Sequence, residues 1–247
     1  MSYLLIDDGN SRLKWAMASS AGELSQVQLA TVNSKLETNW DDCEKPDAIL
    51  ISSVGSEQHK QNLIDLFENK WHIVPAFVTS PAKDFGVVNA YREPTRLGSD
   101  RWAAMIAAYQ IEQSAVLVVD AGTALTIDAI DDNGRHLGGL ISPGLSLSRR
   151  TLASDTNMEF GAVDKTSSSL FASSTEQGIA GGTHYALSSL VEHAYRNFEE
   201  QLGAATNKPR CYLTGGDAEK IKETLECPYT HEPLLVLKGL ALIAVRE

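Results

Sequence analysis

The sequence predicts an α/β protein in which one β-β-β-α-β-α unit occurs twice, and three observations lead to this prediction. A short apolar run that ends in Asp-x-Gly followed by Asn or Thr occurs at residues 3–10 and again at 115–123. Two further strand patterns follow each of these turns, and each half also contains a strand that leads into a helix. A duplicated turn alone is a plausible coincidence, but a duplicated order of elements indicates an internal repeat.

The first half begins with three predicted strands. The apolar run at residues 3–6 is short and bounded, which is typical of a buried strand. Gly9 and Asn10 predict a tight turn after it, because both residues tolerate positive φ. Residues 13–18 then predict the returning strand of a hairpin, and residues 24–32 predict a third strand.

The first half continues with a strand that leads into a helix. Residues 48–53 form the apolar strand pattern, and residues 56–71 have helical spacing with a polar face. Residues 72–79 predict another strand. Because Pro75 cannot donate a hydrogen bond to a sheet, we expect this strand at a sheet edge.

The second half repeats the same order. Residues 115–119, 125–130 and 136–142 predict a hairpin followed by a third strand. Residues 211–216 then predict a strand that leads into a helix at residues 217–225.

Three segments connect or close these units. Residues 80–97 lack a strong period and predict a loop that faces the substrate, followed by a helix at residues 98–110. Residues 153–174 are rich in Ser, Thr and Asp and are too long for a passive connection, so they predict either a flap that orders with substrate or a disordered surface loop. A long helix to residue 201 follows. Residues 234–245 predict an apolar helix that closes the second domain or makes a dimer contact.

The first turn carries residue types that suit a phosphate and its metal. Asp7 can hold a hydrated Mg²⁺, which prefers one or two carboxylates together with phosphate oxygens. The N–H groups near Gly9 can close on a phosphate because glycine has no side chain to block it, and Lys14 can supply a positive charge. The alternative is an ordinary hairpin with Asp in its turn and Lys in solvent. The repeat at Asp120 favours the phosphate interpretation.

The helix that starts near Gly98 carries a second candidate site. Ser99 or Asp100 is a natural N-cap, and capping alone explains these residue types. An Asp-Arg pair beside a cleft can also take part in the chemistry. Asp100 could accept the proton of an attacking hydroxyl, and the guanidinium of Arg101 could bind a substrate carboxylate through two hydrogen bonds.

Glycine-rich segments in the second half suggest a nucleotide site. Gly215 and Gly216 lie between a predicted strand and helix, where they leave room for a ring or phosphate. Gly144 follows Pro143 and is expected to line the nucleotide cleft, whereas packing of a strand end explains most of the pair at 138–139. The sequence contains neither a Gly-x-Gly-x-x-Gly nor a Walker A pattern, which disfavours Rossmann and P-loop folds.

Composition limits the classes of partner. The net charge of −11 and the pI of about 5.0 disfavour nucleic acid, whose binding needs a basic surface. Cys43, Cys211 and Cys227 are odd in number and widely spaced, which fits a reducing compartment better than a disulfide framework or a zinc site. Because no signal-peptide pattern and no apolar run of membrane-helix length occur, we expect a cytoplasmic protein that does not bind a membrane.

Taken together, these motifs resemble those of type III pantothenate kinases, which belong to the superfamily of actin, sugar kinases and acetate kinase. The resemblance covers nearly the whole chain. Gly-x-Asp-Arg and the segment from Thr175 distinguish the pantothenate enzymes within the superfamily. The matching segments are residues 7–14, 98–101, 119–124, 138–144, 175–182 and 214–217.

The resemblance implies a fold, a set of ligands and a set of binding residues. The expected fold has two actin-like (RNase H-like) domains, residues 1–113 and 114–247, with an ATP cleft between them. The implied residues for ATP and its phosphates are Asp7, Asp8, Gly9, Asn10, Ser11, Arg12, Leu13, Lys14, Thr123, Gly215 and Gly216. The implied residues for pantothenate are Tyr91, Gly98, Ser99, Asp100, Arg101 and Thr175. Mg²⁺ is expected at Asp7, and a monovalent cation, K⁺ or NH₄⁺, at Asp120.

The implied activity is ATP-dependent phosphorylation of pantothenate to 4′-phosphopantothenate, the first step toward coenzyme A, with Asp100 as proton acceptor. The implied active unit is a homodimer. Two departures from the family pattern are small: Ser11 stands where Thr is usual, and Asp8 adds an acid that should face away from Asp7 if the strand continues. The rival functions are a related kinase for a sugar or carboxylate, and a nucleotide-binding regulator or filament protein without turnover.

Overall fold

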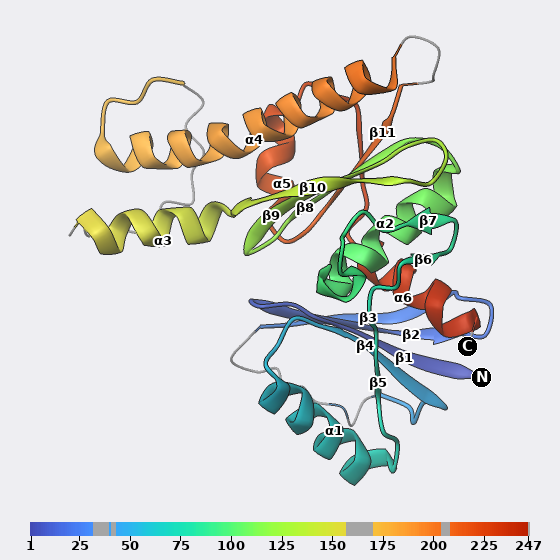
Figure 1. Ribbon diagram of the computed structural model, residues 1–247. Coiled ribbons are helices and arrows are strands. Elements are labelled where there is room, and N and C mark those ends of the chain that lie inside the picture. The colour runs from blue at the N-terminus through green and yellow to red at the C-terminus, as the bar shows by residue number, and fades with distance from the viewer. Residues whose placement is uncertain (32–39, 41–42, 157–169, 204–207, 247) are drawn as a thin grey trace. The chain divides into compact units, whose positions relative to one another are not determined.

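The computed structural model describes residues 1–31, 40, 43–156, 170–203 and 208–246 (Figure 1). The chain divides into two compact units. Unit 1 comprises Met1–Ile111 together with Leu234–Glu247, and unit 2 comprises Glu112–Pro233. Each unit is built on one five-stranded sheet.

The sheet of unit 1 has the strand order β3-β2-β1-β4-β5. Its strands are β1 (Ser2–Asp8), β2 (Arg12–Ser19), β3 (Leu24–Thr31), β4 (Ala48–Ser53) and β5 (Ala76–Phe77). The first three strands are antiparallel neighbours, whereas β4 pairs in parallel with both β1 and β5. The predicted edge position is confirmed, because β5 ends the sheet and follows Pro75 directly.

The sheet of unit 2 repeats this topology with the order β10-β9-β8-β11-β12. Its strands are β8 (Val116–Ala121), β9 (Ala124–Ile130), β10 (His136–Pro143), β11 (Arg210–Thr214) and β12 (Tyr229–His231). The same pairs are antiparallel and the same pairs are parallel as in unit 1. The predicted α/β fold with a duplicated unit is confirmed, and β12 is a strand that the sequence did not reveal.

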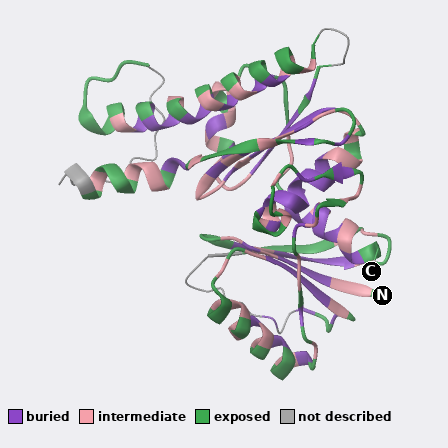
Figure 2. Cartoon of the chain, in the orientation of Figure 1, coloured by how far each residue is buried: buried purple, intermediate pink, exposed green. Residues whose placement is uncertain are grey.

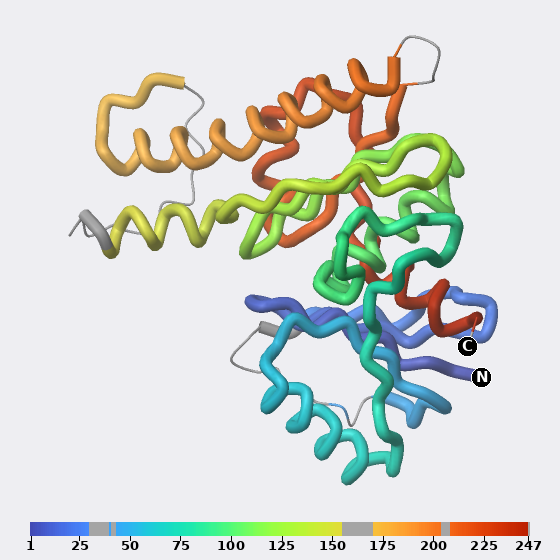
Figure 3. Tube along the Cα trace, in the orientation of Figure 1, coloured from blue at the N-terminus to red at the C-terminus, as the bar shows by residue number. Residues whose placement is uncertain are grey.

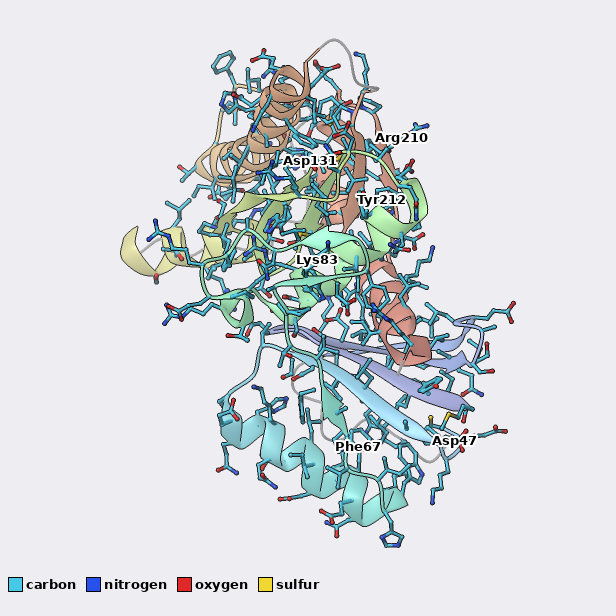
Figure 4. All side chains as sticks on the ribbon, turned by 45° about the vertical axis from the view of Figure 1, so that its right-hand side comes forward. Asp47, Phe67, Lys83, Asp131, Arg210 and Tyr212 are labelled. Carbon is cyan, nitrogen blue, oxygen red and sulfur yellow. The ribbon has the colours of Figure 1, made fainter. Side chains whose placement is uncertain are left out.

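One helix covers each face of the sheet of unit 1, and Figures 1 and 2 show α1 on one face and α6 on the other. Helix α1 (Glu57–Trp71) begins where Ser56 Oγ accepts the N–H of His59 at 3.3 Å, and it ends at His72, which has a φ of 58°. Its side chain Phe67, labelled in Figure 4, belongs to the apolar core on the face of Leu4.

Helix α6 (Leu235–Arg246) belongs to unit 1, whereas the two expectations from the sequence were that it closes the second domain or makes a dimer contact. It packs on β1, β2 and β4, and the backbone of Gly239 lies against that of Ala103 in α2 (Ser99–Glu112), so closely that a Cβ at Gly239 would overlap it. Apolar helical spacing predicted a buried helix correctly but could not show which sheet the helix covers.

The predicted substrate loop contains a small hairpin. Strands β6 (Lys83–Asp84) and β7 (Val87–Val88) pair in antiparallel fashion and a 3₁₀ turn, η3, covers Pro94–Arg96. Gln110 Nε2 donates to the carbonyl of Phe85 at 2.7 Å, and the guanidinium of Arg246 pairs with Asp84. The loop is therefore fastened to helices α2 and α6.

The helices of unit 2 are α3 (Leu145–Thr156), α4 (Thr175–Leu202), α5 (Ala218–Ile221) and the 3₁₀ turn η4 (Lys222–Thr224). Helices α4 and α5 pack on the sheet of unit 2, as the trace in Figure 3 shows for α4, whereas α3 packs against α4. Most of the predicted flap at 153–174 lies outside the described residues, which end at 156 and resume at 170. In unit 1, residues 32–39, 41 and 42 are also outside them.

A buried polar pair joins the start of unit 2 to its sheet. Tyr212 Oη donates to Glu112 Oε1 at 2.7 Å, and Figure 4 labels Tyr212 together with Arg210 on β11. Burial raises the pKa of Tyr212, and the neighbouring Glu112 carboxylate raises that pKa further. The phenol therefore stays protonated and keeps its hydrogen bond.

The surface of unit 2 includes an apolar stretch on the edge strand β10, which is drawn as exposed in Figure 2. Leu140 and Ile141 are 46% and 65% exposed, and Phe171 before α4 is 86% exposed. Within the described residues, the helices are too short or too polar to cross a membrane.

Candidate functional site

The first hairpin places a carboxylate, that of Asp7, beside an ammonium group, that of Lys14. Asp7 at the end of β1 lies opposite Lys14 of β2 and, on its other side, opposite Ser52 of β4. Asp7 and Lys14 are partly exposed. A partly exposed carboxylate can bind a hydrated cation, and an adjacent ammonium can bind a phosphate oxygen.

The turn of this hairpin differs from the expected one. Residues 9–11 connect the two strands, but neither Gly9 nor Asn10 has a positive φ. The predicted reason for a glycine here was therefore wrong. A Cβ at Gly9 would lie 3.2 Å from the carbonyl oxygen of Arg12, so glycine favours the close approach of the two chain segments. The side chains of Asn10, Ser11 and Arg12 are exposed.

Two predicted phosphate residues direct their side chains elsewhere. The side chain of Asp8 is buried against α1, where it binds Ser53 and His59, and the side chain of Leu13 belongs to the apolar core. The sequence expectation that Asp8 faces away from Asp7 is confirmed, because β1 runs through Asp8. The predicted contact of Asp8 and Leu13 with phosphate is thereby limited to their main-chain atoms.

The second candidate site adjoins this hairpin through a buried hydrogen bond. Ser52, beside Asp7 in the ladder, shares a 2.9 Å hydrogen bond with the hydroxyl of Ser99. Helix α2 begins at Ser99, so Gly98 occupies the N-cap position. The prediction of Ser99 or Asp100 as the N-cap was therefore wrong. A Cβ at Gly98 would lie 2.5 Å from Asp100 Oδ1, so glycine makes room for this carboxylate. Sequence reasoning missed Ser52, because a serine at a strand end carries no distinctive pattern.

Arg101 and Tyr91 come together as the resemblance implied. Arg101 is only 7% exposed, and its Nη1 donates to Tyr91 Oη at 2.9 Å. The guanidinium carbon lies 5.7 Å from the centroid of the Tyr91 ring. A buried guanidinium held in one orientation is suited to bidentate binding of a carboxylate.

Asn89 orients Tyr91 in the loop and was also missed. Its Oδ1 accepts the N–H of Tyr91 at 3.0 Å, and its Nδ2 donates to the carbonyls of Pro81 and Pro94 at 3.1 and 3.2 Å. One amide thus joins three points of the loop. An Asn between two prolines was the only sequence signal for this role.

In unit 2, the second hairpin and the glycine turn after β11 form one cluster. Asp120 pairs with Thr214 in the ladder, and Asp217 N–H donates to the carbonyl of Ala121 at 2.8 Å. Gly215 has a φ of 96°, and a Cβ there would overlap the Asp120 carboxylate and the backbone of Ala121. The predicted nucleotide residues of the second half therefore lie together.

Gly144, the residue directly before α3, also contacts the second hairpin. Its N–H donates to the carbonyl of Thr123 at 2.9 Å, and a Cβ on Gly144 would overlap the carbonyl oxygen of Gly122. Thr123 and Gly216 are partly exposed, so both remain accessible to a ligand.

Thr175 is the exposed first residue of α4. The preceding residue Ser174 caps the helix by accepting the N–H of Gln177 at 3.3 Å. The backbone N–H of Glu176 and the Ser174 hydroxyl lower the pKa of Glu176. The Thr175 hydroxyl is not needed for the cap.

The described residues contain no group of three or more His, Cys, Asp or Glu side chains that could hold a metal by themselves. Magnesium bound through one carboxylate, phosphate oxygens and water does not require such a group. In the first hairpin the Asp7 carboxylate is partly exposed, whereas that of Asp8 is buried. The Asp120 carboxylate and the carbonyl oxygen of Ala121 both lie near the turn at Gly215, and oxygen atoms are the ligands that a hard monovalent cation would need.

Comparisons with known proteins agree with this arrangement. The sequence profile of type III pantothenate kinases matches residues 3–197. A type III pantothenate kinase from Nitrosospira multiformis is 35% identical over 244 residues, covering 98% of this chain and 90% of that protein.

Two solved structures are similar in fold. A conserved putative Baf family transcriptional activator from Campylobacter jejuni has a TM-score of 0.64 at 22% identity, with 98% of each chain covered. The activator of 2-hydroxyisocaproyl-CoA dehydratase from Clostridium difficile, solved with bound ADPNP, has a TM-score of 0.57 at 14% identity and covers 100% of this chain and 95% of that one. At these identities the likeness concerns the fold alone.

Proposed function

The chain belongs to the type III pantothenate kinase family, and we propose that it transfers the γ-phosphoryl group of ATP to the primary hydroxyl of pantothenate. The product is 4′-phosphopantothenate, and the reaction is the first step toward coenzyme A. The duplicated actin-like α/β fold supports the use of ATP. The observation that carries the substrate assignment is the buried Arg101, bonded to Tyr91 and directly adjacent to Asp100.

In this proposal the first hairpin binds the phosphates of ATP. The main-chain N–H groups of residues 9–11 contact phosphate oxygens, and Lys14 neutralises part of their charge. The exposed side chains of Asn10, Ser11 and Arg12 add donors. Asp7 holds Mg²⁺, which neutralises charge on the phosphates when it is bound.

The substrate residues of unit 1 position pantothenate. Arg101 binds the pantothenate carboxylate through its guanidinium fork, and Tyr91 keeps that fork in place. Gly98 and Ser99 line the same helix start. Asp100 accepts the proton of the primary hydroxyl while the hydroxyl oxygen forms its bond to the γ-phosphorus, and ADP leaves. Because the transition state is loose, orientation of the hydroxyl contributes more than the strength of the base.

Unit 2 supplies the remaining ATP contacts in the proposal. Thr123 contacts the phosphates from the second hairpin, and Gly215 and Gly216 contact the adenosine part. Their clustering with Asp120 supports this assignment. Asp120 holds the monovalent cation, K⁺ or NH₄⁺, and its carboxylate and the carbonyl oxygen of Ala121 both lie near the turn at Gly215.

We also propose a homodimer in which Thr175 contacts pantothenate. The exposed apolar side chains of Leu140, Ile141 and Phe171 support an interface on unit 2, because burying exposed apolar side chains favours association. The exposed Thr175 hydroxyl is available for such a contact. A cytoplasmic location is part of the proposal and is supported by the three buried, unpaired cysteines.

The proposed function is tested by the substrate dependence of ADP release. Release from ATP should depend on pantothenate and should not occur with glucose or acetate in its place. Replacing K⁺ by Na⁺ should lower the rate, because the proposed site at Asp120 would be filled less well. Turnover with a sugar or with acetate would favour one of the rival kinases. ATP binding without any turnover would favour a nucleotide-binding regulator, and the name of the Campylobacter jejuni protein is that of a transcriptional activator.

A further inference from the structure

A buried cluster of polar side chains, formed by Asp8, Ser53 and His59, adjoins the first hairpin. None of these side chains has been given a role in binding ATP, Mg²⁺ or pantothenate. The side chain of Asp8 has an exposed fraction of 0%. Its Oδ2 accepts the hydroxyl of Ser53 at 2.6 Å and the Nε2–H of His59 at 2.9 Å. Ser53 Oγ in turn accepts the N–H of Gly55 at 3.1 Å. The cluster therefore joins the end of β1 to the turn between β4 and α1.

The local structure is arranged so that this carboxylate can be buried. Burying a carboxylate is costly unless it is hydrogen-bonded, and the Asp8 carboxylate has hydrogen-bond partners in Ser53 and His59. His59 lies in the first turn of α1, where the helix dipole also favours negative charge. A Cβ at Gly55 would lie 2.6 Å from the His59 ring, so glycine makes room for the ring in this position.

The cluster fixes Asp8 at two points. Besides the carboxylate, its carbonyl oxygen accepts the N–H of Val54 at 3.4 Å. Asp8 is the residue immediately before the turn at residues 9–11 and immediately after Asp7. Restricting Asp8 therefore restricts the main chain on both sides of it, which includes the donors and the carboxylate assigned to ATP and Mg²⁺.

We infer that Asp8 and His59 form a positioning pair that holds the first hairpin in the conformation that binds ATP. The inference rests on the proposed role of the hairpin in ATP binding. His59 acts through Asp8 and the main chain and does not touch the substrate.

The test compares His59→Ala with His59→Gln, whose side-chain amide can still donate to Asp8. His59→Ala should raise the KM for ATP about tenfold and leave the KM for pantothenate unchanged, because misplaced binding groups lose affinity without affecting the other substrate. Calorimetric titration with a non-hydrolysable ATP analogue and Mg²⁺ should show a similar loss of affinity. His59→Gln should recover most of it, and Gln58→Ala, an exposed change on the same helix turn, should match the unmodified chain.

Three outcomes would overturn the inference. The first is a lower melting temperature of His59→Ala without change in ATP affinity, which would make the pair merely structural. The second is a His59→Gln variant as impaired as His59→Ala, and the third is an equal rise in KM for both substrates. If the unmodified chain bound no ATP, the proposed function itself would fail, which the same titration distinguishes.

Discussion

Replacing Asp100 by Asn should lower kcat by about a hundredfold or more, because removal of a positioned proton acceptor typically costs that much. The change preserves the size of the side chain, and Asn can still accept the N–H of Arg101 that Asp100 Oδ1 accepts at 2.7 Å. The KM for pantothenate should therefore change little, since Arg101 and Tyr91 stay in place. Steady-state kinetics of ADP release measure both quantities.

The matched control is Asp132→Asn, which also removes one carboxylate but lies exposed in the turn between β9 and β10. It should leave both kinetic constants as they are. If Asp100→Asn turned over at the unmodified rate, Asp100 would not be the proton acceptor, and the role of the α2 start would reduce to binding.

Replacing Gly215 by Ala should destabilise unit 2 by about 3 kcal/mol and abolish most of the activity. Two costs combine: an L-residue is strained at a φ of 96°, and the added Cβ overlaps the Asp120 carboxylate and the Ala121 backbone. Relief of this overlap must displace the second hairpin. Chemical denaturation monitored by circular dichroism gives the free energy of unfolding.

Gly138→Ala is the control that measures the cost of backbone strain without the cost of overlap. Gly138 has a φ of 112°, but an added Cβ would meet nothing within 4 Å. Its replacement should cost only about 1–2 kcal/mol, from backbone strain alone. Equal destabilisation by the two changes would show that the close approach of the glycine turn to the second hairpin contributes nothing.

The sequence was sufficient to predict the duplicated sheet. Each hairpin carries its own local signal, an apolar run closed by Asp-x-Gly. The edge position of β5 followed from Pro75 alone, since one missing donor excludes a central strand. The resemblance to the family implied that Arg101 and Tyr91 both bind pantothenate, whereas the hydrogen bond between them was found only in the structure.

The features that were missed depend on contacts between segments distant in the sequence. Which sheet α6 covers is decided by the fit of Gly239 to Ala103, and no pattern within the helix encodes that choice. Ser52 is linked to the start of α2 by its hydrogen bond to Ser99, and His59 is linked to the first hairpin by its hydrogen bond to Asp8. The turn at Gly9 was predicted from conformational freedom, but close approach to Arg12 explains the glycine there.

The central claim is that the phosphoryl group moves to the primary hydroxyl of pantothenate, and phosphorus NMR of the reaction products tests it most directly. With ATP, Mg²⁺, K⁺ and pantothenate, one new phosphomonoester resonance should appear, and it should couple to the methylene protons of the primary alcohol. Its amount should equal the ADP formed. Inorganic phosphate in place of that resonance, or an ester at the secondary hydroxyl or the carboxylate, would contradict the account.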